Sequence, residues 1–211
     1  MKNVVNIRHY ITRVGKDVFD DWLSDLADAR TQAKIATRID RLAAGNFGDC
    51  KPLRQGLCEL RIDWGPGYRV YYAMLGRASV LLLCGGDKQR QSSDIERALG
   101  YLNDYKDKDR RSMKRKASIS HDEAMVRRLR KDPDFAAEYL KAALEDADEP
   151  RVLLIALRHL AQAQGIAKIA KAAGVERESL YRALSSNGNP RLSTLFAVAK
   201  AVGLKLTVEA A

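Results

Sequence analysis

Hydrophobic positions in the first half of the chain repeat with two different periods. In residues 16–27 and 30–44 apolar side chains recur every three or four positions, which predicts two amphipathic helices. Farther on, Cys58, Leu60 and Ile62 alternate with charged residues, which predicts a strand with one buried face. The full set of predicted elements is a β-rich stretch at 4–12, the two helices, strands at 57–63, 68–75 and 79–84, and a helix at 92–105. This order predicts an α+β domain with two helices packed on a small antiparallel sheet.

The second half shows helical periodicity until its last residues. Ser120 and Glu123 form a capping box, and Asp132 precedes Pro133 at another predicted helix start. The predicted helices span 120–131, 133–146, 150–164, 166–173, 177–184 and 192–201, with a short strand at 204–208. The two short helices around Gly174 have the spacing of a helix-turn-helix, so an all-α domain of this kind is predicted.

A basic stretch separates the two halves. Residues 106–116 hold seven basic and two acidic residues and supply +5 of the net charge of +10. Such a run cannot bury a core, so it predicts a solvated linker or helix end, with phosphate binding as the alternative. Its Met113 is a candidate former start of a separate second protein. The predicted division is a domain at 1–105, a linker at 106–117 and a domain at 118–211.

Composition argues against a metal centre and against a membrane protein. The cysteines are odd in number and lack metal-ligand spacing, which is typical of reduced core thiols: Cys50, Cys58 and Cys84. The histidines are far apart in sequence, on elements that look unrelated: His9, His121 and His159. No apolar run reaches the length of a membrane span, and the first residues lack a signal-peptide core. We therefore expect a cytoplasmic protein with no metal, no cofactor and no membrane partner.

One face of the predicted sheet is rich in arginine and tyrosine. If strands 57–63 and 68–75 form a hairpin, four polar residues share that face: Glu59, Arg61, Arg69 and Tyr71. Arginine binds phosphate through two hydrogen bonds and tyrosine stacks on unpaired bases, so this face favours RNA as the ligand. Charges that merely keep an edge strand soluble are the alternative.

Two stretches carry a family resemblance: GNFGDCKPLRQGLCELRIDWGPGYRVYY at 45–72 and LLLCGGDKQRQSSDIERAL at 81–99. They resemble the phage Gp49-like, HigB-type branch of the RelE superfamily of toxins, and the likeness spans nearly all of residues 1–105. The resemblance implies a RelE-like fold and a ribosome-dependent endoribonuclease that cuts mRNA in the decoding site.

RNA can cleave itself when its 2′-hydroxyl is deprotonated, aligned with phosphorus, and the growing phosphate charge is offset. Arg61 and Arg69 are the candidates for clamping the phosphate and stabilising the transition state, and Lys88 for charge stabilisation or proton transfer. The predicted RNA-binding residues are Lys51, Arg54 and Tyr71. Ion pairing is the alternative for Arg61 and Lys88, with the neighbouring carboxylates Glu59 or Asp63, and Asp87 or Asp94.

Four stretches of the second half carry another resemblance: SHDEAM at 120–125, RKDPDFAAEYLKAALED at 130–146, LLIALRHLAQAQG at 153–165 and RESLYRALSSNGNPRLSTL at 177–195. They resemble the HigA-type antidote proteins of the Xre helix-turn-helix family, which implies binding to a toxin and repression of the shared operon as a dimer. The candidate DNA-binding residues are Arg177, Glu178, Ser179, Tyr181 and Arg182. Glu176 departs from the Ser or Thr preferred at the start of this helix.

The two resemblances together predict a type II toxin–antitoxin module in one chain. The endoribonuclease part is expected to be inhibited in the intact chain by the fused antidote, through pairing within one chain or between two. The expected partners are mRNA and the ribosome, operator DNA and a second copy in a homodimer. The alternative is a DNA-binding transcriptional repressor whose toxin-like half is an inactive scaffold.

Overall fold

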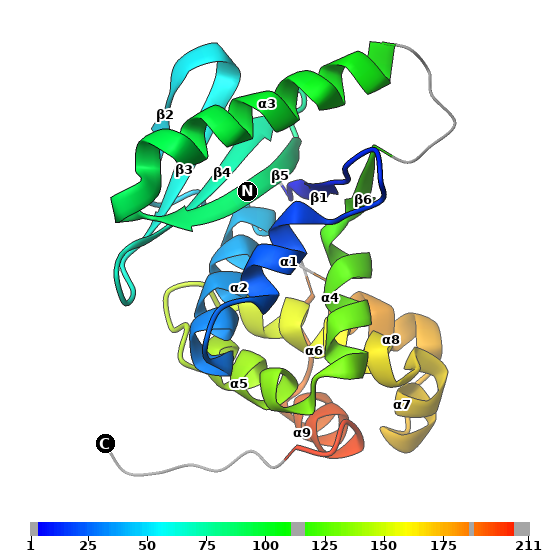
Figure 1. The fold of residues 1–211 in the computed structure, drawn as a ribbon. Coiled ribbons are helices and arrows are strands. Elements are labelled where there is room, and N and C mark those ends of the chain that lie inside the picture. Colours follow the sequence, from blue (N-terminus) through cyan, green and yellow to red (C-terminus); the bar gives the residue numbers. More distant parts are fainter. Residues whose placement is uncertain (1–3, 111–116, 186–187, 205–211) are drawn as a thin grey trace. The chain divides into compact units, whose positions relative to one another are not determined.

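A computed structural model describes residues 4–110, 117–185 and 188–204 of the chain (Figure 1). Its contacts divide the chain into two compact units, Met1–Ala124 and Met125–Ala211. Each unit is considered by itself. The predicted strand at 204–208 and residues 111–116 of the predicted linker lie outside the described residues, apart from position 204.

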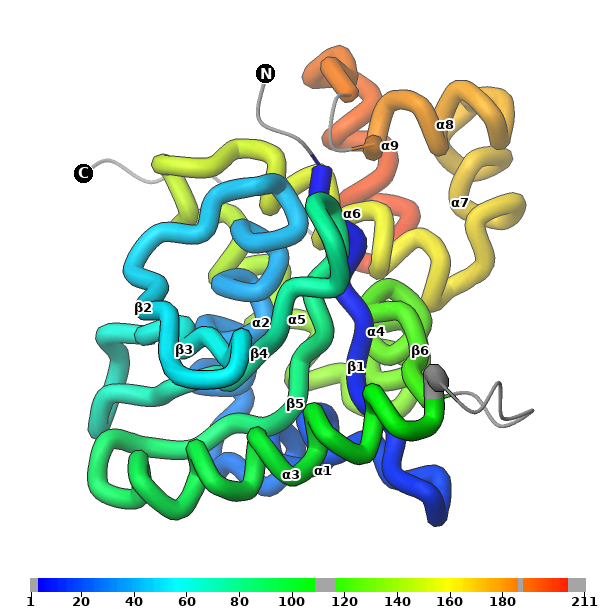
Figure 2. Tube along the Cα trace, turned by 90° about the horizontal axis from the view of Figure 1, so that it is seen from above, coloured from blue at the N-terminus to red at the C-terminus, as the bar shows by residue number. Residues whose placement is uncertain are grey.

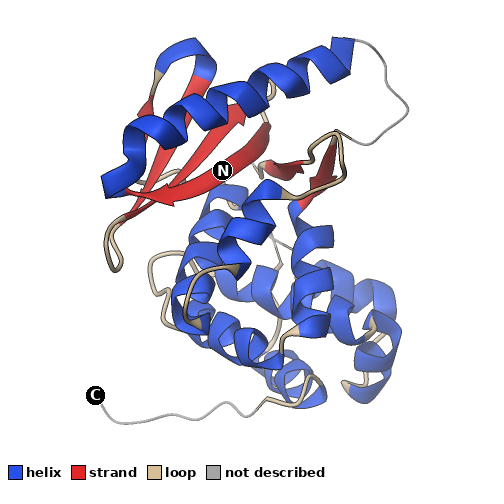
Figure 3. Cartoon of the chain, in the orientation of Figure 1, coloured by secondary structure: helices blue, strands red, loops and turns tan. Residues whose placement is uncertain are grey.

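The first unit is built on a mixed sheet that has six strands among the described residues, in the order β2-β3-β4-β5-β1-β6 (Figure 3). Their bounds are β1 Asn6–Tyr10, β2 Cys50–Pro52, β3 Leu57–Ile62, β4 Tyr68–Met74, β5 Ser79–Asp87 and β6 Ser118–Ser120. β1 runs parallel to β5, while the other pairs are antiparallel. The prediction of an antiparallel sheet is therefore wrong at β1. The two helices that follow β1 carry the chain over one face of the sheet before the next strand begins, and such a crossover allows β1 to lie parallel to β5. β2 and β6 are too short to produce a detectable period.

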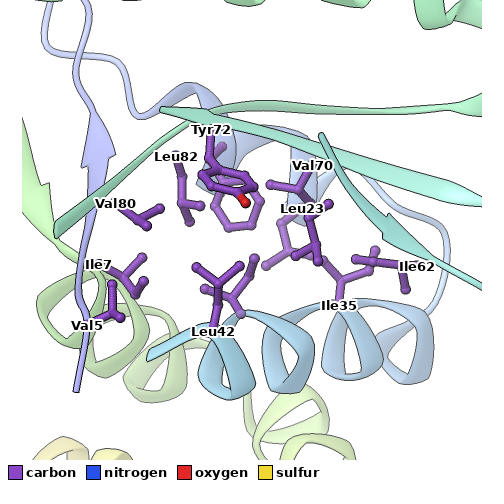
Figure 4. Close-up of a cluster of buried hydrophobic side chains, with 13 residues drawn as sticks. Val5, Ile7, Leu23, Ile35, Leu42, Ile62, Val70, Tyr72, Val80 and Leu82 are labelled. Atoms are coloured by element: carbon purple, nitrogen blue, oxygen red, sulfur yellow. The ribbon is translucent and has the colours of Figure 1, made fainter. Parts of the chain in front are cut away.

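Helices cover both faces of this sheet. On one face lie α1 (Val18–Ser24) and α2 (Ala29–Ala43), as the helical periods predicted. Their apolar sides meet those of the strands in one core, shown in Figure 4, that includes Leu23, Ile35, Leu42, Val70, Tyr72 and Leu82. The opposite face is covered by α3 (Gln91–Arg110), through Ala98, Leu99 and Leu102. The sequence did not place this third helix over the sheet, and α3 also continues well beyond its predicted end at 105.

The second unit is helical, as predicted. α4 (His121–Lys131) begins in the first unit and continues into the second. The other helices are α5 Pro133–Leu144, α6 Arg151–Gln164, α7 Ile166–Ala172, α8 Arg177–Ala183 and α9 Leu192–Ala201. α6 packs on α5, α7 and α9, and α7 packs on α8 and α9. Two predicted caps are confirmed: Ser120 Oγ accepts from the Glu123 amide at 3.0 Å, and the Asp132 side chain accepts from the Phe135 amide.

Gly85 on β5 provides the space for an aromatic side chain of α1. A Cβ atom at position 85 would lie 2.1 Å from the Trp22 ring, whereas a Cβ at Gly100 on α3 would meet no atom within 4 Å. Gly85→Ala should therefore lower the free energy of unfolding by about 1–3 kcal/mol through overpacking. The control Gly100→Ala should be neutral or stabilise by up to about 1 kcal/mol. Tryptophan fluorescence during urea denaturation measures both, and equal stabilities would contradict the packing.

Candidate active site and nucleic-acid interface

The predicted polar residues of the sheet lie in adjacent rows on one face. Arg61 on β3 is directly opposite Arg69 on β4, and in the next row Glu59 is opposite Tyr71. Directly opposed residues present their side chains on the same side of a sheet. The predicted grouping of these four residues on one face is therefore confirmed. It is the face that α3 covers, since Tyr71 belongs to the core beneath that helix.

Glu59 is the centre of this group. Its side chain is fully buried, and its Oε1 accepts a hydrogen bond of 2.8 Å from Arg61 Nε. The Oε2 lies 3.6 Å from Arg69 Nε and accepts a hydrogen bond of 2.6 Å from Gln91 Nε2 at the start of α3. The hydrogen bond that Arg61 donates to Glu59 raises the pKa of the Arg61 guanidinium. One carboxylate thus holds two arginines beside each other, and ion pairing of Arg61, one of the alternatives drawn from the sequence, is present.

Glu59 was not among the predicted site residues. Its signal in the sequence was its position two residues before Arg61, which places both side chains on one face of a strand. Lys51 lies opposite Glu59 on β2 and is exposed, so it continues the same row toward the edge of the sheet. Glu59 is therefore a buried carboxylate with three cations around it: Lys51 in its own row, and Arg61 and Arg69 in the adjacent row.

Tyr71 is enclosed rather than presented to solvent. Its side chain is fully buried, and its hydroxyl has no hydrogen-bond partner among the residues that the structure describes. Burial, together with the nearby Glu59 and Asp94 carboxylates, raises the pKa of Tyr71. The predicted stacking of Tyr71 on a base is therefore not available while α3 covers the sheet.

Lys88 and Arg54 occupy different surroundings. Lys88 is exposed in a short 3-10 turn, Lys88–Arg90, that follows β5. The preceding Asp87 uses its side chain to accept from the amides of Gln89 and Arg90, so it caps this turn. Arg54 instead pairs with Glu96 of α3, beside an open pocket of about 350 Å³ lined by Leu53, Arg54, Ser92, Ile95 and Glu96.

Asp94 is a second buried carboxylate on this face. A Cβ at Gly86 would lie 1.8 Å from its Oδ2, so only glycine leaves room for the carboxylate there. Burial raises the pKa of Asp94, and the Arg97 guanidinium at 2.8 Å acts in the opposite direction. Arg97 also donates to the carbonyl oxygen of Gly85 at 3.0 Å. These contacts join the first turns of α3 to the end of β5.

The structure also corrects the interpretation of the histidines. His9 on β1 and His121 at the start of α4 are in contact, with His9 Nε2 2.8 Å from His121 Nδ1. They were predicted to lie on unrelated elements because β6, which brings His121 to β1, was not predicted. His159, in the second unit, contacts Tyr139, whose hydroxyl is 2.9 Å from His159 Nδ1.

The second unit presents one helix with an exposed polar side. α7 and α8 are joined by a turn in which Gly174 has a φ of 67°. Leu180 and Leu184 are fully buried, as predicted for the anchoring side of α8 and the residue that follows it. The predicted DNA-binding residues divide into exposed Arg177, Glu178 and Arg182, and half-buried Ser179 and Tyr181.

Contacts within α8 order these polar side chains. The Arg177 guanidinium lies over the Tyr181 ring, with its Cζ atom 5.7 Å from the ring centroid. Arg182 Nη2 is 3.4 Å from Ser179 Oγ. Glu176 makes no side-chain hydrogen bond at the start of the helix, as its departure from Ser or Thr suggested. The first amides of α8 therefore lack a side-chain cap.

Two family models match separate parts of the chain. Residues 21–103 match "Phage derived protein Gp49-like", and residues 122–210 match "Probable addiction module antidote protein". The chain belongs to both of these families, each over its own part. The two matches together support a toxin–antitoxin protein.

Curated relatives match about a third of this chain. An uncharacterized protein of Haemophilus influenzae is 55% identical over 80 residues, which make up 38% of this chain and 81% of the relative. A second uncharacterized protein of that organism is 41% identical over 71 residues, or 34% of this chain and 72% of the relative. The search of solved structures found no significant match. Within the described ranges no helix has the length and apolarity needed to cross a bilayer.

The unpartnered hydroxyl of Tyr71 makes a prediction about stability. Tyr71→Phe removes a buried group that makes no described hydrogen bond, so the free energy of unfolding should change by less than about 0.5 kcal/mol or increase. Tyr139→Phe is the matched control, because that hydroxyl bonds to His159 and its loss should cost about 1 kcal/mol. Calorimetry of the full chain measures both. A marked loss of stability in Tyr71→Phe alone would reveal a partner for its hydroxyl.

Proposed function

We propose that the Gp49-like part is an mRNA endoribonuclease that acts on the ribosome. The observation that carries this proposal is the pair Arg61 and Arg69, held side by side by the buried Glu59. Two adjacent guanidiniums match the oxygens of a phosphodiester better than they match a neutral ligand. The family match supplies the toxin context for this pair.

In the proposed reaction the RNA supplies its own nucleophile. The 2′-hydroxyl gives up its proton as its oxygen attacks the adjacent phosphorus, the bond to the 5′-oxygen breaks, and that oxygen takes up a proton. The products are a 2′,3′-cyclic phosphate and a 5′-hydroxyl, with no net change in protons. Arg61 and Arg69 stabilise the negative charge that grows on the phosphate oxygens. Lys88, exposed after β5, offsets charge or transfers a proton, while Lys51 and Arg54 bind the RNA backbone.

The intact chain is proposed to be the inhibited form of this nuclease. The match of residues 122–210 to an antidote family, in the same chain as the Gp49-like part, supports an inhibited state. Because the antidote part is tethered to the toxin part, its effective concentration is on the order of millimolar. Pairing within one chain and exchange between two chains of a homodimer are both compatible with such a tether.

The antidote part is proposed to repress its operon by binding operator DNA. The exposed side of α8 carries Arg177, Glu178 and Arg182, which are residue types that bind base edges in the major groove. Ser179 and Tyr181 add contacts to phosphate or to neighbouring side chains. The family match to an antidote protein supports this role.

A repressor with an inactive toxin-like scaffold is the second candidate. The observation that favours it is the same pairing of both arginines with Glu59, since a guanidinium engaged by a carboxylate is less available to phosphate. The two candidates differ in whether the first unit cleaves RNA once it is separated from the antidote part.

Cleavage should be visible with the first compact unit, residues 1–124, in a ribosome-containing translation mixture. We expect this unit to cleave mRNA and the full chain to cleave far less. Arg69→Ala should lower the cleavage rate about 10²-fold, because it removes a group that stabilises the transition state. Arg77→Ala changes the same charge at an exposed position outside the site and should have no effect.

Two outcomes would count against this assignment. Wild-type rates in Arg69→Ala would show that the arginine pair is not the active site. A folded 1–124 unit that binds ribosomes and leaves mRNA intact would favour the scaffold alternative.

Binding to the DNA upstream of the gene tests the second part. In the full chain, Arg182→Ala should weaken sequence-specific binding by about 1–3 kcal/mol, because a base contact is lost. Lys141→Ala on α5 is the control with the same change of charge. Affinity should fall steeply with salt in an electrophoretic mobility assay. Equal affinities of Arg182→Ala and Lys141→Ala would exclude α8 as the DNA-reading helix.

A further inference from the structure

A pocket opens between the turn that follows β2 and the first turns of α3. It has a volume of about 350 Å³ and is lined by Leu53, Arg54, Ser92, Ile95 and Glu96, all of which belong to the first unit. α3 contacts β3, β4 and β5, and Figure 1 and Figure 2 both show it along one side of these strands. The volume lies at the lower end of the range for small-ligand sites, about 300–1,000 Å³, so the pocket has room for one small ligand.

The apolar lining of the pocket comes from Leu53 and Ile95. Both side chains are half-buried, and both pack against the core beneath α3 that includes Leu57 and Tyr71. The Leu53 amide donates to the carbonyl oxygen of Leu57 at 2.8 Å, which holds the turn against β3. The faces of a nucleobase are apolar, and burying them against aliphatic side chains is favourable. These two residues therefore suit a base better than a fully charged ligand.

The charged lining of the pocket is an ion pair. Arg54 and Glu96 are both exposed and are joined through Arg54 Nη2 and Glu96 Oε1. Among the described residues the pair uses only this nitrogen of the guanidinium, so the donors on Nε and Nη1 can bind a phosphate oxygen. Because Glu96 offsets the charge of Arg54, an anion without an attached base gains little here.

The pocket adjoins the arginine pair of the sheet. Gln91 donates to Glu59 Oε2 and lies one helical turn before Ile95, on the same side of α3. Side chains four residues apart on a helix are neighbours, with Cβ atoms about 5–6 Å apart. Glu59 also contacts both Arg61 and Arg69. A nucleotide in the pocket would therefore lie next to a phosphate bound by these arginines.

We propose that this pocket is a nucleotide-binding site, which holds one unpaired nucleotide of the RNA next to the phosphate that is cleaved. Leu53 and Ile95 contact the base, and Arg54 binds the 5′-phosphate of the same nucleotide. Glu96 is a positioning residue that orients Arg54. The assignment of RNA as the ligand rests on the proposed function. The affinity of the pocket for a nucleotide does not depend on whether the first unit cleaves RNA.

Methyl NMR of the full chain tests the proposal, with AMP, adenosine and inorganic phosphate as probes. The methyl resonances of Leu53 and Ile95 should move upfield with AMP and with adenosine, because an aromatic base shields the methyl groups that it covers. AMP should bind about fivefold more tightly than adenosine, through the ion pair between its phosphate and Arg54. Inorganic phosphate has no base and should leave these methyl resonances in place.

Three variants separate the base contact from the phosphate contact. Arg54→Gln should bind AMP no more tightly than adenosine and should leave the affinity for adenosine unchanged. Ser92→Trp should fill the pocket and weaken the binding of both probes at least about tenfold, because the indole covers the apolar lining. Ser93→Trp is the matched control, since Ser93 is exposed on the same turn and does not line the pocket, and it should behave like the wild type.

Several results would overturn the proposal. One is that the Leu53 and Ile95 methyl resonances stay in place with AMP and adenosine at millimolar concentrations, and another is equal weakening by Ser92→Trp and Ser93→Trp. Equal affinities of the wild type for AMP and adenosine would exclude the phosphate contact of Arg54. Cleavage of mRNA by residues 1–124 without nucleotide binding at the pocket would reject this site alone. Binding of AMP without cleavage would support the site and count against the nuclease.

Discussion

Helices bury the sheet of the first unit on both faces, so each polar group on its central strands must find a partner within the protein. This constraint explains the contacts that distinguish the unit. Glu59 is paired with Arg61, Arg69 and Gln91, and Asp94 with Arg97. Gly85 and Gly86 leave room for Trp22 and the Asp94 carboxylate. Among the described residues of this face, three buried atoms have no hydrogen-bond partner: the Tyr71 hydroxyl, Arg69 Nε and Asp94 Oδ2.

The need of buried polar groups for partners also connects the proposed chemistry with its inhibition. Glu59 positions the two arginines that a phosphate would need, and the same carboxylate neutralises them while RNA is absent. A phosphodiester would have to compete with Glu59 for both guanidiniums, and access to Tyr71 would require α3 to move. The proposed active and resting states therefore differ in which anion the arginines face.

At the edge of the sheet, backbone N–H and C=O groups need hydrogen-bond partners, as the buried side chains do on its faces. β1 lies between β5 and β6, so its hydrogen bonds on one side come from a segment distant in sequence. The buried His9 and His121 rings lie beside this edge. This edge thus combines backbone pairing, which any sequence could provide, with a contact between two histidine rings.

Local patterns in the sequence determined the elements whose signals are local. The alternation around Leu60 predicted β3, the spacing around Gly174 predicted α7 and α8, and the Asp132–Pro133 pair predicted the start of α5. The sharing of one face by Arg61 and Arg69 was also predictable, because side chains alternate strictly along a strand.

Only the tertiary structure decided the features that depend on pairing between distant residues. The parallel entry of β1, the three-residue strands β2 and β6, and the covering of the polar face by α3 leave no periodic signal in the sequence. The burial of Tyr71 and the contact between His9 and His121 follow from those pairings. The sequence alone therefore determined which residues could do chemistry, while long-range packing decided which of them meet, because burial and proximity are properties of the folded chain.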